Sequence, residues 1–268
     1  MKYNDVLSKE SMLSYLDSSL KNIEIETFDT IGSTNTYLKD KTTKGLKEGH
    51  LVVALEQTAG RGRYNRKFFS PSGTGLYWSV LLYPTKFEAS KAIKITTMAA
   101  VAVCEAIEEL SDLKPEIKWV NDIYIDGKKV CGILTEGHVS TETLLLESAV
   151  LGVGLNIYTP EGGFPEDIKD IATALFTEPH FDMKNKLVAT FLNRFFYYYN
   201  SENDKEYTDK YKQYSFVIGK NITIVSNGSE RPATVLDIDD DCRLIVKNED
   251  GETEFLSHGE IKIKDFLN

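Results

Sequence analysis

The sequence predicts an α+β fold in which strands and helices are followed by a small β-barrel. Ser90–Leu110 is the clearest helix, because Ile93, Thr97 and Val101 follow a 3.6-residue period. From Asn221 onward, five short strands with tight turns fall within about fifty residues, which is typical of a small barrel. The chain has 268 residues, 41% of them hydrophobic, so it can bury a large core and a small one.

The first third of the chain reads as helix, strand, helix and two strands. Leu13, Leu16 and Leu20 have helical spacing, and Glu24–Phe28 alternates as a strand does. A helix is then expected over Thr36–Lys44. The remaining assignments of this part are Ser33 or Thr34 as the N-cap of that helix, and strands at Leu51–Glu56 and Leu76–Tyr83, the latter ended by Pro84.

The middle of the chain predicts four strands and three helices. The strands are Ile117–Trp119, Ile123–Ile125, Lys129–Glu136 and Leu144–Leu151. Asp126-Gly127 is a strong hairpin turn between the second and the third. The helices are Ile168–Phe176, Asn185–Tyr199 and Asp204–Tyr214.

Composition excludes several classes of protein. The net charge is −10 and the pI about 5.0, so we expect no long-range attraction to DNA or to acidic membranes. Three scattered cysteines without CxxC spacing argue against a disulfide framework or a zinc site and favour a reducing cytoplasm. The four histidines are dispersed and suggest no catalytic triad. Neither a signal peptide nor a membrane span is expected at the N-terminus or later.

A basic loop is the sharpest functional signal. No Asp or Glu occurs from Gln57 to Phe87, although the whole chain has 41 acidic and 31 basic residues. Within this gap, cationic side chains are crowded into seven residues, and Gly60 and Gly62 free the backbone to approach a ligand closely. These cations are Arg61, Arg63, Arg66 and Lys67. The pattern favours capture of a compact anion such as phosphate over a merely solvated loop.

Four weaker motifs accompany the loop, each with a plainer alternative. Ser33-Thr34-Asn35 offers three neutral hydrogen-bonding groups at a helix entrance, of which an N-cap explains one. Asn121-Asp122 is either a turn or a site where Asp122 binds a metal or orients an amine. Lys129, with Gly132 after it, points either into a site or to solvent. Gly152 and Gly154 either allow close sheet packing or form the floor of a pocket.

Together and in this order, the motifs resemble those of the biotin protein ligase family. The matching pieces are Ser33–Asn35, Gln57–Arg63 with Arg66 and Lys67, Lys118–Asp122, Lys129–Glu136 and Gly152–Asn156. The resemblance covers roughly residues 25–265. It implies a mixed β-sheet backed by helices, the class II synthetase-like fold of biotin and lipoate ligases, over residues 1–215. It also implies an SH3-like barrel over residues 216–268.

The resemblance also implies an ATP-dependent reaction in two steps. The carboxylate of biotin attacks the α-phosphate of Mg-ATP and gives biotinyl-5′-AMP and pyrophosphate. A lysine of a biotin carboxyl carrier domain, from acetyl-CoA carboxylase or a related carboxylase, then takes the biotinyl group and releases AMP. Homodimerisation is known among relatives. A repressor role is not expected, because only about 25 residues precede the first catalytic strand and no basic recognition helix is present.

Site residues follow from the resemblance residue by residue. Lys129, Arg63 and Asp122 are implied as catalytic, and Asp122 as a Mg²⁺ ligand. Biotin would be bound by Ser33, Thr34, Asn35, Gln57, Gly60, Arg61, Gly62, Arg63, Lys129, Gly132 and Gly152. ATP or the adenylate would be bound by Arg61, Arg63, Arg66, Phe68, Asn121, Lys129 and Asn156.

Three positions depart from the family pattern, and two other functions stay open. Phe68 replaces a usual tryptophan near the adenine, Val120 replaces the proline of Trp-Pro-Asn-Asp, and Cys131 replaces a small residue. A lipoate–protein ligase would use the same adenylate chemistry. A non-catalytic sensor of biotin or of the adenylate is the alternative outside the enzymes. The loop at residues 60–68 is expected to become ordered only with biotin or the adenylate.

Overall fold

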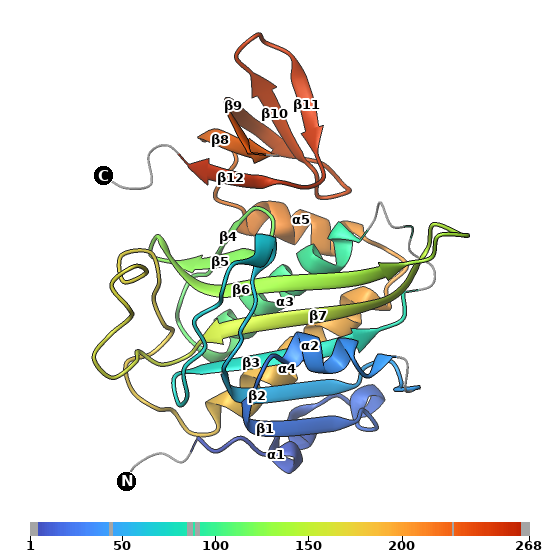
Figure 1. Ribbon diagram of the computed structural model, residues 1–268, viewed down its shortest axis with the longest axis vertical. Coiled ribbons are helices and arrows are strands. Elements are labelled where there is room, and N and C mark those ends of the chain that lie inside the picture. The colour runs from blue at the N-terminus through green and yellow to red at the C-terminus, as the bar shows by residue number, and fades with distance from the viewer. Residues whose placement is uncertain (1–4, 43–44, 85–87, 89–91, 227, 264–268) are drawn as a thin grey trace.

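A seven-stranded mixed sheet forms the larger part of the protein (Figure 1). The computed structural model describes residues 5–42, 45–84, 88, 92–226 and 228–263. The strand order is β1-β2-β3-β7-β6-β5-β4, with β1 and β2 parallel and the other neighbours antiparallel. The strands are β1 (Ile25–Ile31), β2 (Leu51–Gln57), β3 (Gly75–Leu82), β4 (Glu116–Lys118), β5 (Asp122–Ile125), β6 (Lys128–Val139) and β7 (Leu146–Asn156).

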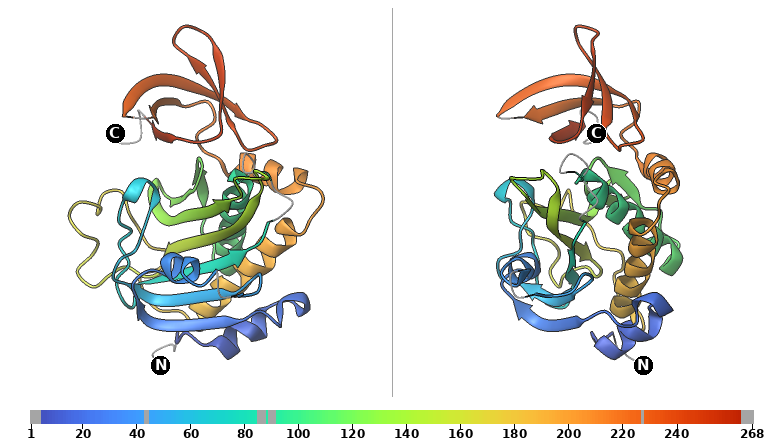
Figure 2. Two further views of the ribbon diagram at one scale, coloured as in Figure 1. Left: turned by 45° about the vertical axis from the view of Figure 1, so that its right-hand side comes forward. Right: turned by 90° about the vertical axis from the view of Figure 1, so that its right-hand side faces the viewer.

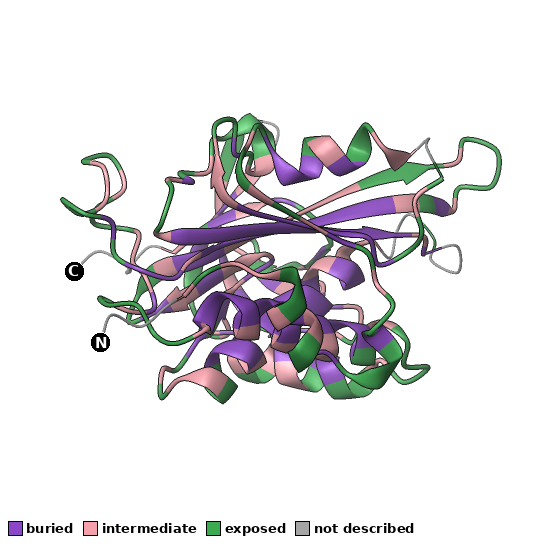
Figure 3. Ribbon diagram, turned by 90° about the horizontal axis from the view of Figure 1, so that it is seen from below, coloured by how far each residue is buried: buried purple, intermediate pink, exposed green. Residues whose placement is uncertain are grey.

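Helices cover both faces of this sheet, as the two further views show (Figure 2). They are α1 (Lys9–Tyr15), α2 (Thr34–Lys39), α3 (Ile93–Leu110), α4 (Met183–Tyr199) and α5 (Lys205–Tyr214). Helices α3 and α4 belong to the main core on one face. Helix α2 lies on the other face, where Leu38 packs with Val52, Leu81 and Val150. All eight residues of β3 are buried, because both of its faces are covered (Figure 3).

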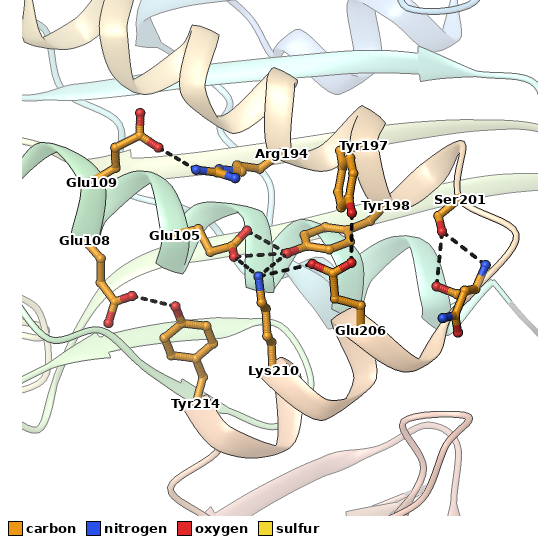
Figure 4. Close-up of polar contacts among 11 residues, drawn as sticks. Glu105, Glu108, Glu109, Arg194, Tyr197, Tyr198, Ser201, Glu206, Lys210 and Tyr214 are labelled. Carbon is orange, nitrogen blue, oxygen red and sulfur yellow. Dashed lines mark hydrogen bonds and ion pairs between the residues drawn. The ribbon is translucent and has the colours of Figure 1, made fainter.

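A polar network ties together the three helices on the back of the sheet (Figure 4). Lys210 of α5 lies 2.5 Å from Glu105 of α3, and its ammonium donates to the Tyr198 hydroxyl of α4 at 2.9 Å. Tyr198 in turn donates to Glu105. Burial raises the pKa of Tyr198 to about 12, so its hydroxyl remains protonated at neutral pH. Hydrogen bonding between partly buried groups therefore fixes how α3, α4 and α5 pack.

A five-stranded antiparallel sheet follows α5. Its strands are β8 (Asn221–Ser226), β9 (Ser229–Ile238), β10 (Leu244–Asn248), β11 (Thr253–Leu256) and β12 (Glu260–Ile263), in the order β11-β10-β9-β8-β12. The five predicted strands are confirmed, and the small sheet is consistent with the predicted SH3-like barrel. The domain division at residue 215 stays a prediction.

Buried contacts join this terminal sheet to the larger part of the protein. Lys94 of α3, only 7% exposed, lies 2.7 Å from Asp204 and 3.1 Å from Asp241 in the β9–β10 turn. The indole of Trp119 donates to the carbonyl of Cys242 at 3.0 Å. The terminal sheet is therefore held against α3 and the β4–β5 turn.

The predicted helix at Ile168–Phe176 is wrong. The segment makes a single turn, in which Ala172 N–H bonds to Ile168 O, and then pairs with strands of the sheet. Lys129 N–H donates to Ile171 O at 2.8 Å, and Thr173 N–H donates to Lys129 O at 2.9 Å. Backbone groups that a helix would need are thus used by the start of β6.

Helix α2 begins two residues earlier than expected and ends at Lys39. Ser33 is its N-cap, with its side chain accepting from Thr36 N–H. Residues 29–31 extend β1 beyond its predicted end at Phe28, since they continue the parallel pairing with β2 as far as Gln57. The end of the predicted helix at Lys44, and the start of the helix predicted from Ser90, lie outside the described residues. The first helix ends at Tyr15, so Leu16 and Leu20 lie outside it, with Leu20 in a separate 3-10 turn at Ser18–Leu20. Strand β7 runs five residues beyond its predicted end at Leu151, and the remaining predicted elements agree with the structure to within three residues.

Glu26 on β1 anchors α2 to the sheet and gives the fold a pH dependence. It accepts a hydrogen bond from Tyr37 OH at 2.6 Å and lies 2.7 Å from His50 Nε2. Burial alone would raise the pKa of Glu26, but Tyr37, His50 and Lys41 outweigh burial and lower it below the usual 4.5. The stability that Glu26 contributes is therefore fully present above pH 4.5 and is lost as pH falls through the lowered value.

We expect the melting temperature of Glu26→Gln to depend less on pH below 4.5 than that of the wild type. The wild-type protein loses this ionised group's contribution on acidification, whereas the variant lacks it at every pH. Thermal melts from pH 6 to pH 3 by circular dichroism would measure the two slopes. Glu202→Gln, at an exposed position, is the control and should follow the wild type. Parallel curves for the wild type and Glu26→Gln would contradict the prediction.

Candidate active site

A cavity lies on the α2 face of the large sheet, under the basic loop and beside the terminal sheet. It encloses about 930 Å³ of empty space, part of it open to solvent. Of the predicted site residues, these line it: Ser33, Thr34, Asn35, Gln57, Arg61, Gly62, Arg63, Arg66, Phe68, Asn121, Asp122, Lys129, Gly132 and Gly152. Gly60 and Asn156 are the two that do not. Five separated sequence motifs therefore meet at one place.

Glycines form the floor of the cavity. Gly132 of β6 pairs with Gly154 of β7, so both lie on one face of the sheet. A Cβ atom at Gly154 would come within 2.5 Å of the Phe68 ring, and one at Gly132 within 3.0 Å. A Cβ at Gly152 would lie 2.0 Å from Asn35 Oδ1. Gly152 and Gly154 therefore line the cavity, as the second of their two interpretations predicted. The absence of a Cβ atom makes room there for Asn35 and Phe68.

The neutral end of the cavity is a buried set of hydrogen-bonding side chains at the start of α2. The backbone N–H of Thr34 donates to Gln57 Oε1 at 2.9 Å. Asn35 donates through Nδ2 to Glu136 at 3.1 Å. Ser79 of β3 lies with its hydroxyl 2.7 Å from Thr34 Oγ1 and 2.6 Å from Asn35 Oδ1. The three polar residues at the helix entrance thus do more than cap the helix.

The basic loop is a short hairpin, and neither Gly60 nor Gly62 makes its turn. Gly62 N–H donates to Arg66 O at 2.8 Å, and Gly62 itself has ordinary extended dihedral angles. Tyr64 and Asn65 make the turn, with φ of 55° and 59°. Gly60 is needed for packing within the loop, since a Cβ there would lie 2.5 Å from Ser70 Oγ and 2.6 Å from Phe68 O.

The guanidinium groups of the loop are held by fixed partners. Arg61 lies 3.4 Å from Glu136. Arg63 donates to Asn121 Oδ1 at 2.9 Å and to the carbonyl of Gly259 at 2.8 Å. Arg66 forms a bidentate ion pair with Glu260 of β12, at 2.8 and 2.7 Å. The short helical turn at residues 63–65 accordingly lies next to the terminal sheet (Figure 1).

Lys129 points into the cavity, not to solvent. Its ammonium lies 2.6 Å from Asp122 Oδ1 and 6.0 Å from the centre of the Phe68 ring. Asp122 also accepts from Asn121 Nδ2 at 3.0 Å, and it pairs with Gly132 across the β5–β6 ladder. The solvent-facing alternative for Lys129 is therefore wrong, and Asp122 is more than a turn residue.

Two departures from the family pattern leave this arrangement intact. The Trp119–Val120 peptide bond is cis, and Asn121 O accepts from Ile133 N–H at 2.9 Å. Asp122 pairs with Gly132 in the β5–β6 ladder. The side chain of Cys131 is fully buried, and burial raises the pKa of its thiol. It is a buried thiol and not a nucleophile.

Asn156 lies at the end of β7, beyond the cavity. Its side chain donates to Thr173 O at 3.0 Å, and its carbonyl accepts from Leu175 N–H at 3.1 Å. Its predicted contact with the nucleotide stays a prediction. The observed contacts hold the segment after β7 against the sheet.

The predicted site residues leave out Lys118, Glu260 and Ile261, which line the cavity, and Ser79, which contacts Thr34 and Asn35 behind it. Ser79 is fully buried in the apolar strand β3, and a polar residue at such a position was the available signal. Lys118 had appeared only as part of a motif. Its pKa is lowered mainly by burial and further by Lys129, although Asp122 opposes this. Glu260 and Ile261 come from the terminal sheet, where no local pattern links them to a site.

The described residues contain no cluster of three metal-ligating His, Cys, Asp or Glu side chains. Asp122 lies beside several cations, and Glu260, the other carboxylate that lines the cavity, is paired with Arg66. One carboxylate together with substrate phosphates is a common way to hold Mg²⁺ in nucleotide sites. The residues present therefore fit a Mg²⁺ ion that arrives with a nucleotide better than a dedicated metal centre.

Two family models match the chain. The biotin/lipoate A/B protein ligase family matches residues 27–156, and the biotin protein ligase C-terminal domain matches residues 217–264. The chain is 42% identical over 147 residues to the bifunctional ligase/repressor BirA of Bacillus subtilis. That alignment covers 55% of this chain but only 44% of the length of BirA.

Two longer alignments cover most of both proteins. The biotin--[acetyl-CoA-carboxylase] ligase of Mycobacterium tuberculosis is 27% identical over 242 residues, which are 86% of this chain and 85% of that protein. The structure of biotin protein ligase from Aquifex aeolicus in complex with biotin and ATP superposes with a TM-score of 0.74 at 26% identity. It covers 90% of this chain and 98% of that one. Both family models and both long alignments thus agree: the chain belongs to the biotin protein ligase family.

Proposed function

We propose that this chain is an ATP-dependent biotin–[acetyl-CoA-carboxylase] ligase. The observation that carries the proposal is one cavity with a neutral hydrogen-bonding end, a glycine floor and a cationic end. A neutral ureido ring suits the first, and a carboxylate and phosphates suit the last. The Aquifex aeolicus relative, solved in complex with biotin and ATP, supports the same ligand pair.

In the first step, the biotin carboxylate attacks the α-phosphate of ATP and pyrophosphate leaves. Both reacting groups are anionic, so their approach is opposed by repulsion. Lys129, Arg61 and Arg63 line the cavity where the two anions would meet. Cations already held by hydrogen bonds, as Lys129 and Arg63 are, or by an ion pair, as Arg61 is, stabilise the transition-state charge with little reorganisation.

Magnesium would enter as part of the nucleotide substrate. Asp122 is the carboxylate placed to contact it, with the remaining ligands supplied by phosphate and water. Arg66 would contact the outer phosphates of ATP. In the structure, Arg66 forms a bidentate ion pair with Glu260. On nucleotide binding, its guanidinium would exchange this carboxylate for a phosphate.

In the second step, the ε-amine of an acceptor lysine attacks the carbonyl of the mixed anhydride and AMP leaves. The acceptor would belong to a carrier domain of acetyl-CoA carboxylase or a related carboxylase. Asp122 would orient the incoming amine and accept the proton that its nitrogen loses as the amide bond forms. In the structure its carboxylate lies 2.6 Å from the Lys129 ammonium. Three free buried cysteines are compatible with work in the reducing cytoplasm.

The decisive test is to mix the protein with biotin, Mg-ATP and an apo biotin carboxyl carrier domain. The proposal expects carrier that streptavidin detects, with one pyrophosphate and one AMP released per transfer. Lipoyl transfer from added lipoate, without biotinyl transfer, would support a lipoate ligase instead. Biotin binding without transfer would support a sensor. Either of these two outcomes would overturn the proposal.

Trypsin cleavage within residues 60–68 should slow when biotin and Mg-ATP are bound. The loop carries four cleavable side chains, and Tyr64 at its tip is 59% exposed. Ligand anions that contact Arg61 and Arg63 would restrain it. Mass spectrometry of timed digests would give the rates, with an exposed site such as Lys169 as the internal control. Equal loop cleavage with and without ligands would contradict ligand-induced ordering.

A further inference from the structure

The turn between β4 and β5 carries side chains that meet at the cationic end of the cavity. Asn121 in this turn accepts from Arg63 through Oδ1 at 2.9 Å and donates through Nδ2 to Asp122 Oδ1 at 3.0 Å. Asp122 in turn lies 2.6 Å from the Lys129 ammonium. The position of the Asn121 side chain therefore affects both the guanidinium and the carboxylate that would act on the reacting groups.

A buried tyrosine of α5 holds the backbone of this turn. Tyr211 donates its hydroxyl hydrogen to the Val120 carbonyl oxygen at 3.0 Å. Tyr211 is fully buried and Val120 is 5% exposed, so the contact is shielded from water. Burial raises the pKa of the Tyr211 hydroxyl, which therefore keeps the proton that it donates. The Val120 carbonyl and the Asn121 N–H belong to one planar peptide, so the hydroxyl fixes the plane from which Asn121 projects.

The neighbouring residues of the turn are held by other elements. Asn121 O accepts from Ile133 N–H, and Asn121 Nδ2 donates to Ile133 O, both at 2.9 Å. These two bonds attach Asn121 to β6, whereas Tyr211 fixes the peptide that precedes it. On the other side, the indole of Trp119 donates to Cys242 O of the terminal sheet at 3.0 Å. Residues 119, 120 and 121 are thus held by the terminal sheet, α5 and β6 respectively.

Tyr211 is not among the residues that line the cavity, so any effect on the reaction must pass through the turn. We propose that Tyr211 is a positioning residue for adenylate formation, because it holds Asn121 where this side chain aligns Arg63 and Asp122. The inference rests on the proposed function, since the proposed reaction supplies one of its readouts.

Tyr211→Phe removes the hydroxyl and keeps the ring, so α5 can pack as before. We expect the single-turnover rate constant of pyrophosphate release to fall about fivefold to tenfold, the effect of roughly one lost hydrogen bond on a barrier. The biotin concentration at half-saturation should stay close to that of the wild type, because the neutral end of the cavity is built on α2, β2 and β3. A lower rate constant at unchanged affinity indicates an effect on the transition state.

Tyr207→Phe is the matched control. Tyr207 lies four residues earlier on α5 and is also fully buried, but its hydroxyl makes no hydrogen bond with the described residues. This variant should keep the rate constant of the wild type. An equal loss of rate in Tyr207→Phe and Tyr211→Phe would overturn the inference, and so would a wild-type rate constant in Tyr211→Phe.

A double-mutant cycle separates positioning from a merely structural role. Tyr211→Phe should lower the rate constant in the wild-type background but not in Asn121→Ala, because its effect passes through that side chain. The melting temperature should fall in both backgrounds, since the hydrogen bond to Val120 O is lost in both. Additive losses in the rate constant would overturn the inference.

Amide hydrogen exchange gives a readout that needs no activity. Ile133 N–H donates to Asn121 O, so its exchange reports opening of the turn. Exchange at Ile133 should be faster in Tyr211→Phe than in the wild type or in Tyr207→Phe, and equal exchange in all three proteins would overturn the inference. Absence of pyrophosphate release by the wild type, together with faster exchange in Tyr211→Phe, would instead count against the proposed function and support the positioning of Asn121 by Tyr211.

Discussion

Replacing Lys129 with alanine should reduce adenylate formation by 10²–10³-fold. The wild-type ammonium lies in the cavity, 2.6 Å from Asp122, and would neutralise charge on both the carboxylate and the α-phosphate. Loss of one fixed electrostatic group of this kind costs about 3–4 kcal/mol of transition-state stabilisation. Pyrophosphate release with biotin and Mg-ATP, in the absence of a carrier, measures this step directly.

The folded state should tolerate the same change. The Lys129 side chain is 31% exposed, and an ion pair of this exposure contributes less than about 1 kcal/mol. The melting temperature should therefore stay close to that of the wild type. Lys128→Ala, at the neighbouring exposed position of β6, is the matched control and should keep full activity. Near-normal pyrophosphate release by Lys129→Ala would refute the role assigned to this lysine.

Replacing Gly152 with alanine should nearly abolish biotin binding and also destabilise the fold. The added Cβ would lie 2.0 Å from Asn35 Oδ1 and 2.8 Å from Asn35 Cγ, so the amide must leave its place. Forced overpacking in a buried strand costs about 1–3 kcal/mol of folding stability. Displacement of Asn35 also breaks the contacts of the neutral end, and we expect an affinity loss of about 100-fold, or about 2.7 kcal/mol.

Two further variants separate the clash from the loss of Asn35. Gly152→Ala/Asn35→Ala removes the obstructing amide, so it should recover stability but not biotin affinity. Gly32→Ala makes the same chemical change where a Cβ would meet none of the described heavy atoms within 4 Å, and it should behave as the wild type. Unfolding in urea and biotin calorimetry provide the two measurements. Normal affinity in Gly152→Ala would show that Asn35 does not serve the ligand.

The sequence predicted the residues that line the cavity better than the residues that hold them in place. Strand periodicity located β2, β3, β6 and β7, and the motifs at their ends converge as expected. The helix expected at Ile168–Phe176 failed because an apolar period alone does not exclude a segment that hydrogen-bonds to a strand end. Ser79 and Glu260 were missed because their partners lie 44–45 and 194 residues away, where no spacing rule applies.

The glycines of the basic loop show the same limit of prediction from sequence. Gly60 and Gly62 both read as flexible points of the basic loop. Only the structure reveals that Gly60 is required by close contact with Phe68 and that Tyr64 and Asn65 turn the chain. A sequence shows where glycine occurs, whereas the reason that glycine is needed there depends on atoms from other parts of the fold.

The contribution of β12 to the cavity has a consequence for biogenesis. Glu260 and Ile261 follow every other lining residue in the chain, so a ribosome releases them last. Until they emerge, the Arg66 guanidinium lacks its carboxylate and that side of the cavity is open to water. A nascent chain that still lacks β12 would thus leave the cavity unclosed beside Arg66.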